Sequence, residues 1–186
     1  MQPCGGDVVG DWTISGACAN GASLAMQVVP NCPTVMATGV NVHASGSASF
    51  KADMTYTLNQ TLTVSASGTL PSSCLVYAGL TLSCAQFDVL IQQYVAMYPM
   101  MLQAAHCSGD QTCNCNFTLA PQTTMETGTW STTGTTLLTT PSTTVSYATD
   151  YCVQKNELHM MTVDTTMPMG PMGEATISAD TVFTKK

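Results

Sequence analysis

The sequence contains little charge. Charged residues make up 8% of the 186 residues, arginine is absent, and the four basic residues are all lysines. With 11 acidic residues, the formal net charge is −7 at pH 7. A nucleic-acid-binding protein needs a basic surface to neutralise phosphates, and this composition excludes one. The same shortage of basic residues argues against adsorption to an anionic membrane surface.

Long hydrophobic runs and the common catalytic motifs are also missing. No run reaches the roughly 18 apolar residues of a membrane-spanning helix. The chain has neither a G-x-S-x-G nucleophile elbow nor a G-x-x-x-x-G-K phosphate loop. Its three histidines, His43, His106 and His159, are far apart in the sequence, and no paired carboxylates suit a two-metal site. We therefore expect no enzymatic activity and no cofactor.

Hydrophobic residues are nevertheless abundant, at 45% of the chain, and threonine and serine supply most of the polarity. This length suits a single domain that buries a substantial core. The composition is typical of an exported β protein.

Nine cysteines predict a disulfide framework in an oxidising compartment. Zinc is the weaker interpretation, because Cys113-Asn114-Cys115 is C-x-C rather than C-x2-C and no second pair stands at finger spacing. Since nine is odd, we expect Cys4 to be left out; the alternative is that Cys4 pairs and another thiol stays free. The eight candidates for bridges, with their pairing open, are Cys18, Cys32, Cys74, Cys84, Cys107, Cys113, Cys115 and Cys152.

Cys4 is the expected site of a lipid anchor. It is followed by Gly5-Gly6-Asp7, as a lipid-modified cysteine is after signal cleavage. We expect residues 1–7 to form a tether and the lipid on Cys4 to supply the chain's contact with a membrane. The predicted location is the periplasm or cell surface of a Gram-negative bacterium, at the outer membrane.

Strand periodicity dominates the first third of the chain. Residues 8–18 and 35–44 are predicted strands, with a turn at Ser45-Gly46-Ser47. Between residues 48 and 66 the even positions are mostly apolar, and the odd positions from 55 to 65 are threonine or serine apart from Asn59, so one face is predicted to be buried and the other exposed to solvent. Two arrangements fit this alternation: a hairpin with a loop at residues 59–61, or one long bent strand.

A helix is predicted within residues 84–98. Apolar residues at 87, 90, 91, 94, 95 and 98 follow helical spacing, and Pro99 should end the helix. Residues 100–106 are predicted to form a short second helix. Cys84 and Cys107 bracket this region, which suits an insertion attached to a sheet, at about residues 74–112.

Hairpins fill the remainder of the chain. One is predicted to turn near Gly134, and another at Lys155-Asn156, where Val153 would pair with Leu158 and Tyr151 with Met160. A closing strand follows at residues 175–183. We count about eight antiparallel strands with a helical insertion between the third and fourth. Such a chain best avoids exposed edges as an up-and-down barrel, a single domain over residues 8–186.

Short motifs in this order resemble those of lipocalins. Gly10-Asp11-Trp12 resembles the lipocalin G-x-W signature, and Thr149-Asp150-Tyr151 the T-D-Y motif. Lys185-Lys186 stand where lipocalins place a basic residue, usually arginine, near that tryptophan. The resemblance implies structural roles for Trp12, Tyr151 and Lys185, with the basic side chain packed over the tryptophan at the closed end of a barrel.

The chain is also similar to uncharacterised Cys-rich, lipocalin-like lipoproteins of myxobacteria. That resemblance implies a fold and a location and no activity. The stretches that carry it are residues 50–57, 113–116, 128–134 and 151–158.

The leading functional hypothesis is non-catalytic binding of a small apolar or amphipathic ligand at the barrel mouth. The predicted lining residues are Phe50, Met54, Tyr56, Leu62, Tyr94 and Met97. One alternative is a structural or interaction protein of the cell surface with a filled barrel. Another is a periplasmic Cu(I)-binding protein, since thioether and imidazole ligands suit Cu(I); its candidate ligands are His159, Met167, Met169 and Met172.

Overall fold

The computed structural model describes residues 2–19, 25–26, 35–77, 79–110, 112–143, 145–168 and 174–186. The first elements in chain order are β1 (Gly10–Ala19), β2 (Ala25–Met26), β3 (Val35–Phe50), β4 (Thr55–Pro71), the 3-10 turn η1 (Ser72–Cys74), β5 (Val76–Tyr77), β6 (Leu80–Thr81) and α1 (Cys84–Met97). They are followed by β7 (Leu102–Ser108), β8 (Thr112–Leu119), β9 (Gln122–Thr133), β10 (Thr136–Pro141), β11 (Tyr147–Gln154), β12 (Glu157–Pro168) and β13 (Glu174–Lys185).

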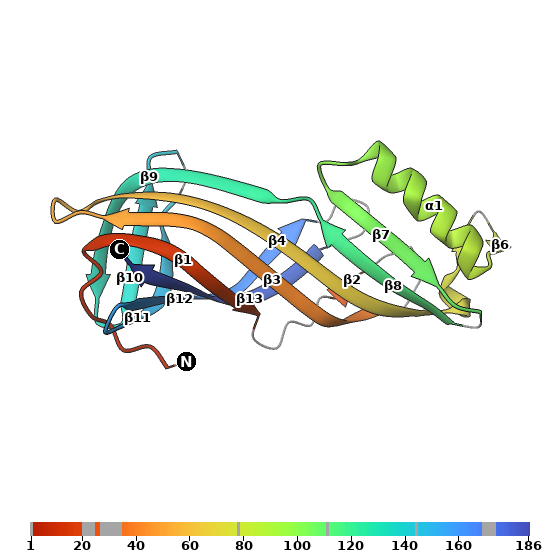
Figure 1. Ribbon diagram of the computed structural model, residues 1–186, viewed down its shortest axis with the longest axis horizontal. Coiled ribbons are helices and arrows are strands. Elements are labelled where there is room, and N and C mark those ends of the chain that lie inside the picture. The colour runs from red at the N-terminus through yellow and green to blue at the C-terminus, as the bar shows by residue number, and fades with distance from the viewer. Residues whose placement is uncertain are drawn as a thin grey trace.

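Eight of the strands close into an antiparallel barrel. Neighbouring strands pair in the order β3-β1-β13-β12-β11-β10-β9-β4, and β4 pairs back onto β3. Figure 1 shows this barrel at the left, with β3 and β4 running on toward the helix. The hairpin of β11 and β12 turns at residues 155–156 and pairs Val153 with Leu158 and Tyr151 with Met160. The predicted mainly β, eight-stranded up-and-down barrel and this register are confirmed.

The alternating stretch forms one long strand rather than a hairpin. β4 continues through residues 59–61, and its turn with β3 lies at residues 51–54. The turn predicted at Ser45-Gly46-Ser47 is therefore wrong, because β3 passes straight through it. Gly46 there has φ 133°, and a Cβ atom would lie 2.0 Å from the carbonyl oxygen of Asn59. Only glycine allows the two strands this close approach.

The insertion between β4 and β9, the third and fourth barrel strands, contains α1 as predicted. It also lengthens the sheet: β8 pairs with the C-terminal half of β4, and β7 pairs with β8. Residues 102–108 thus form strand β7, and the second helix predicted at residues 100–106 is wrong. Pairing with β8 overrides the local pattern, because it buries Ala105 opposite Phe117 and Cys107 opposite Cys115.

Helix α1 begins at a capping box and covers the edge of β7. The Ser83 hydroxyl accepts a hydrogen bond from Gln86 N, and the Gln86 side chain accepts one from Ser83 N. Asp88 Oδ1 accepts from the N–H of Cys107 at 2.7 Å, and Gln92 donates to the carbonyl of Ala105. These contacts satisfy backbone groups that an edge strand would otherwise expose. Among the described helices, none has the length and apolarity to cross a membrane.

Two buried clusters divide the interior. The closed-end core comprises Val8, Trp12, Ile14, Ala44, Ala48, Phe50, Tyr56, Leu137, Tyr151, Leu158 and Phe183. The insertion core comprises Val42, Val64, Ala66, Leu70, Cys74, Leu75, Cys84, Phe87, Ile91, Leu102, Ala105, Cys107, Cys113, Cys115 and Phe117. Ala17 and Leu62 are partly buried and pack against both. These two residues therefore join the two cores.

Candidate functional site

Trp12 and Lys185 seal the closed end of the barrel. The Trp12 side chain is fully buried, and its Nε1–H donates to the carbonyl of Val8 at 2.8 Å. Lys185 Nζ lies 5.3 Å from the Trp12 ring centroid and donates to the carbonyl of Val9 at 3.1 Å. Gly10 has φ 146°, a conformation that favours glycine beside this contact. The structural roles expected of Trp12 and Lys185 are confirmed, with lysine serving where lipocalins use arginine.

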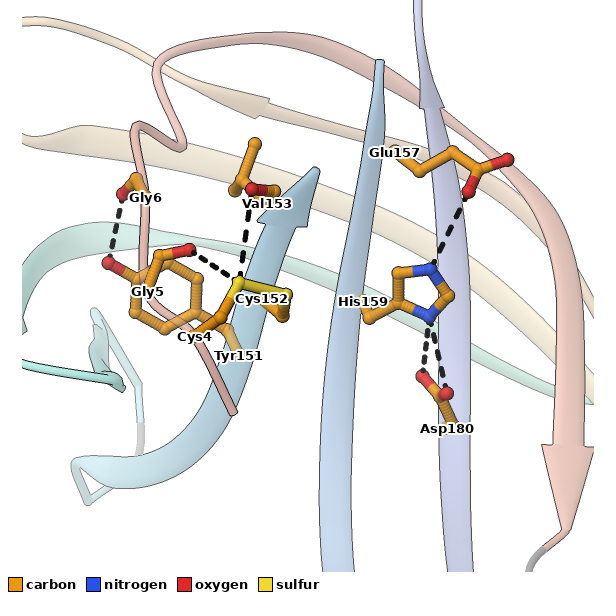
Figure 2. Close-up of a disulfide and its surroundings, with 9 residues drawn as sticks. All are labelled: Cys4, Gly5, Gly6, Tyr151, Cys152, Val153, Glu157, His159 and Asp180. Carbon is orange, nitrogen blue, oxygen red and sulfur yellow. Dashed lines mark hydrogen bonds and ion pairs between the residues drawn. A yellow bond between two sulfur atoms is a disulfide. The ribbon is translucent and has the colours of Figure 1, made fainter. Parts of the chain in front are cut away.

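The N-terminal segment is joined to the barrel by a disulfide. Cys4 bonds to Cys152 on β11, with the two Cα atoms 4.6 Å apart (Figure 2). The N–H groups of Cys4 and Gly5 both donate to the carbonyl of Tyr151 at 3.1 Å. The buried Tyr151 in turn donates its hydroxyl to the carbonyl of Gly6 at 2.9 Å. Residues 4–6 are thus part of the closed end, and Tyr151 has the structural role expected of it.

This disulfide overturns the lipid-anchor prediction. A lipid-modified cysteine carries its lipid on sulfur, and the Cys4 sulfur is already bonded to Cys152. Lipidation of Cys4, and membrane attachment through it, is therefore wrong. Among the described cysteines the free thiol is Cys18, which is exposed near the end of β1. The alternative in which Cys4 pairs and a different thiol stays free is confirmed.

Two further disulfides attach the insertion to its own strands. Cys84 at the start of α1 bonds to Cys113 on β8, and Cys107 on β7 bonds to Cys115. Cys74 is also disulfide-bonded. Cys32 lies outside the described residues. These bridges indicate an oxidising, extracytoplasmic environment.

The six residues predicted to line a ligand site do not gather in one place. Phe50 and Tyr56 stack at a centroid distance of 6.0 Å within the closed-end core. Met54 lies in the β3–β4 turn and is 58% exposed, so its predicted inward orientation is wrong. On α1, Tyr94 packs beside the insertion core, whereas Met97 is 66% exposed and off the helix's buried face. Of the six predicted residues, only Leu62 packs against both cores.

A carboxylate held by two phenols lies where the barrel opens. Glu126 on β9 pairs with Leu58 on β4, which places it on the inner face. Its Oε2 accepts a hydrogen bond from the hydroxyl of Tyr56 at 3.2 Å and another from the hydroxyl of Tyr147 on β11. Tyr56 is 2% exposed and Tyr147 38% exposed. Glu126 therefore connects a phenol buried in the closed-end core with one that is partly exposed to solvent.

Burial and this network raise the pKa of both phenols. Desolvation is the largest cause of the raised pKa of Tyr56, and the neighbouring Tyr147 and Glu126 add to it. Desolvation also raises the pKa of Tyr147, followed by its hydrogen bond to Glu126. Both effects follow because a phenolate beside a carboxylate in a partly dry site is unfavourable. The phenols therefore stay protonated and act as hydrogen-bond donors.

We expect the protein to lose stability as the pH rises above about 10, the ordinary pKa of tyrosine. Below that pH both states keep the phenol protons; above it the unfolded chain releases them first, because the folded pKa is raised. Urea unfolding between pH 8 and 11, in a Cys18→Ala background that prevents disulfide exchange, measures this loss. The Tyr147→Phe variant should show a shallower decline above pH 10 and a wild-type slope below pH 9. Equal slopes throughout would contradict the role of Tyr147.

A groove of about 390 Å3 lies beside Glu126 and Leu58. It lies over β3, β4 and β9 and is mainly hydroxyl-bearing; its lining residues are Ser47, Thr57, Leu58, Asn59, Met125, Glu126, Thr127, Ser142 and Thr143. Hydroxyl pairs recur beside it, such as Thr61 with Thr123 at 3.1 Å. Glu126 is the one charged side chain among these lining residues, and the hydroxyl groups around it offer further hydrogen bonds.

His159 lies on the other side of the sheet from Leu158 and Met160, next to the Cys4–Cys152 bridge. It is 7% exposed, with Nδ1 3.2 Å and 3.3 Å from the two carboxylate oxygens of Asp180 and Nε2 3.7 Å from Glu157 (Figure 2). The register places the free thiol of Cys18 opposite Asp180. In a thiol–imidazole–carboxylate triad the imidazole contacts the thiol. Here the carboxylate lies between them, and the arrangement does not match such a triad.

The described residues show no arrangement of side chains that supports the copper hypothesis. Both ring nitrogens of His159 face carboxylates, and Met169 and Met172 lie outside the described residues. Met167 is placed at the end of β12, opposite Ala175. Within the part of the chain that the structure describes, no cluster of three or more His, Cys, Asp or Glu side chains suits a metal ion. Cu(I) binding stays a prediction.

Glu126 and Tyr147 were missed by reasoning from the sequence. One signal was available, because Glu126 is the only acidic residue between positions 122 and 149, a stretch rich in threonine. A lone carboxylate in such a strand needs partners if it faces inward. Those partners come from β4 and β11, about 70 and 21 residues away along the chain, and no local pattern connects them.

Comparison with models of known protein families, with curated proteins and with solved structures yields no match. The eight-stranded antiparallel barrel and its Trp12–Lys185 seal are consistent with a lipocalin-like fold.

Proposed function

We propose that this protein binds a small apolar or amphipathic ligand at the open end of its barrel, outside the cytoplasm, and catalyses no reaction. The carrying observation is the network of Glu126, Tyr56 and Tyr147 on the inner wall, which connects the buried Tyr56 of the closed-end core with the partly exposed Tyr147. Ligand sites in barrels typically combine an apolar wall with a few convergent polar groups near the mouth. The resemblance of short sequence stretches to uncharacterised Cys-rich, lipocalin-like lipoproteins of myxobacteria is part of this proposal and accords with a location outside the cytoplasm.

The side chains that line the barrel support the proposed ligand site. Large side chains fill the closed end, where Trp12, Leu137 and Phe183 are at most 1% exposed. On β3 the inward positions Ala44 and Ala48 are small, and they pair with Leu62 and Leu58 of β4. Leu58 and Leu62 are only partly buried, so they offer apolar surface to a ligand. An apolar ligand gains by burial there in proportion to the area it removes from water.

Fluorescence titration with the neutral apolar probe N-phenyl-1-naphthylamine tests the proposal. We expect saturable binding at one site per chain. Replacing Leu62 with glutamine removes apolar wall at the junction of the two cores and should weaken binding about 10-fold. Leu80→Gln is the matched control, because Leu80 lies on β6 in the insertion and is 68% exposed. Absence of saturable binding, or an equal loss in both variants, would contradict the proposed function.

An interaction protein is the second candidate. Exposed apolar side chains occur on and after α1, where Val89, Met97 and Met100 are 56%, 66% and 83% exposed. Apolar residues gathered on a surface mark contact sites in many proteins. The same titration separates the two functions, since a contact protein with a filled barrel would leave the probe fluorescence unchanged.

A further inference from the structure

Every unused hydrogen-bonding atom of the Glu126 network is an acceptor. The two phenols donate their only protons to one oxygen, Oε2. Among the described residues, Oε1 of Glu126 has no hydrogen-bond partner. A ligand group that meets this network must therefore supply donors. An anionic head group would meet a carboxylate with no donor to offset the repulsion.

The basic residues of the chain are all at the other end of the barrel. They are Lys51, Lys155, Lys185 and Lys186. Lys51 follows Phe50, the residue paired with Gly10 at the start of β1. Lys185 pairs with Trp12, and its N–H donates to the carbonyl of Asn156, next to Lys155. The open end thus has no lysine to neutralise Glu126, and the charge along the barrel favours a cation at the mouth.

We propose that the ligand is an amphipathic cation, whose ammonium or amidinium head binds Glu126 and whose apolar part lies against Leu58 and Leu62. This inference rests on the proposed function and narrows its ligand class. An ammonium supplies up to three donors to Oε1 and the phenol oxygens, and charge-assisted hydrogen bonds of this kind are the stronger ones. The apolar part is bound by the same desolvation that the neutral probe measures.

Competition between matched amphiphiles tests the head-group preference. Dodecylammonium and dodecyl sulfate share one chain and differ in the sign of the head. Each is titrated below its micelle concentration against bound N-phenyl-1-naphthylamine, using the full, disulfide-intact chain. We expect dodecylammonium to displace the probe about 10-fold more tightly than dodecyl sulfate at low salt.

Two isosteric substitutions test whether the charge of Glu126 causes the head-group preference. Glu126→Gln should abolish it, because a neutral amide gives the cationic head no charge to pair with; the preference is the ratio of the two affinities measured in the same variant. Asp11→Asn removes the same charge from an exposed position at the closed end and should keep the preference. If Glu126→Gln fails to fold, wild-type protein gives the second measurement: raising the salt concentration should shrink the preference, because it is electrostatic.

The outcomes separate this inference from the proposed function. Equal affinity for both amphiphiles, a preference that survives Glu126→Gln, or one that is insensitive to salt would overturn the cationic ligand while the neutral probe still binds. Loss of the preference in Asp11→Asn as well as in Glu126→Gln would also overturn it, since overall charge would then be the cause. If the neutral probe does not bind, the proposed function fails and this inference fails with it.

Discussion

Replacing Trp12 with alanine should lower the free energy of unfolding by about 4 kcal/mol. The ring is fully buried in the closed-end core, so its removal leaves a cavity that the surrounding strands cannot close. The substitution also orphans the carbonyl of Val8, which accepts from Nε1 at 2.8 Å, and removes the surface on which Lys185 packs. Urea unfolding, followed by the fluorescence of Trp130 and by circular dichroism, measures the loss.

Lys185→Met separates the cation from the packing. It keeps an apolar stem over Trp12 and removes the charge 5.3 Å from the ring, so we expect a loss of about 1 kcal/mol. Leu80→Ala, at an exposed site in the insertion, should change stability by less than about 0.5 kcal/mol. A Trp12→Ala effect as small as that of Leu80→Ala would show that the closed end does not hold the barrel together.

Removing the Cys4–Cys152 disulfide should cost about 4 kcal/mol. The two cysteines are 148 residues apart, and the chain-entropy estimate for a loop of this length is about 5 kcal/mol. Residual structure in the unfolded chain lowers the measured contribution below this estimate. The double variant Cys4→Ala/Cys152→Ala, unfolded by urea without reductant, measures this. The hydrogen bonds of residues 4–6 with β11 remain available, so the variant should fold and bind the neutral probe.

Two comparisons make the disulfide prediction specific. Cys107→Ala/Cys115→Ala opens a loop of 8 residues and should cost about 2.5 kcal/mol by the same estimate. Cys18→Ala removes the free, exposed thiol and should leave stability unchanged. Reversal of the order of the two disulfide variants would mean that local packing, rather than chain entropy, decides their contribution. Intact-mass measurement of protein from its natural host should find no lipid on Cys4.

Local alternation was enough to predict the barrel wall. The apolar even positions between residues 48 and 66 face the interior, with Val64 3% exposed and Tyr56 2% exposed. The hairpin at residues 155–156 was predictable in register, since only that turn places apolar residues opposite each other on both strands. The end of α1 before Pro99 was likewise predictable, because proline lacks the N–H that a further helical turn needs.

Errors arose where a long-range partner overrode the local signal. Residues 102–108 have no strong strand pattern, and they form β7 because β8 lies beside them. Gly46 is typical of a turn in sequence, yet here it allows the close approach of two long strands. The residues near Cys4 favoured lipidation, whereas Cys152 is brought to it by the folding of β11. In each case the deciding neighbour is distant along the chain.

The sequence by itself determined the mainly β class, the closed barrel and the inserted helix, and the resemblance of its short motifs to those of lipocalins implied the seal of Trp12 under a lysine. These follow from patterns of period two or 3.6 and from short motifs, each set by residues a few positions apart. Only the tertiary structure decided the disulfide pairing and brought Tyr56 and Tyr147 to one oxygen of Glu126. Contacts between three separate strands depend on the register and curvature of the whole sheet, and that information is not contained in any one segment.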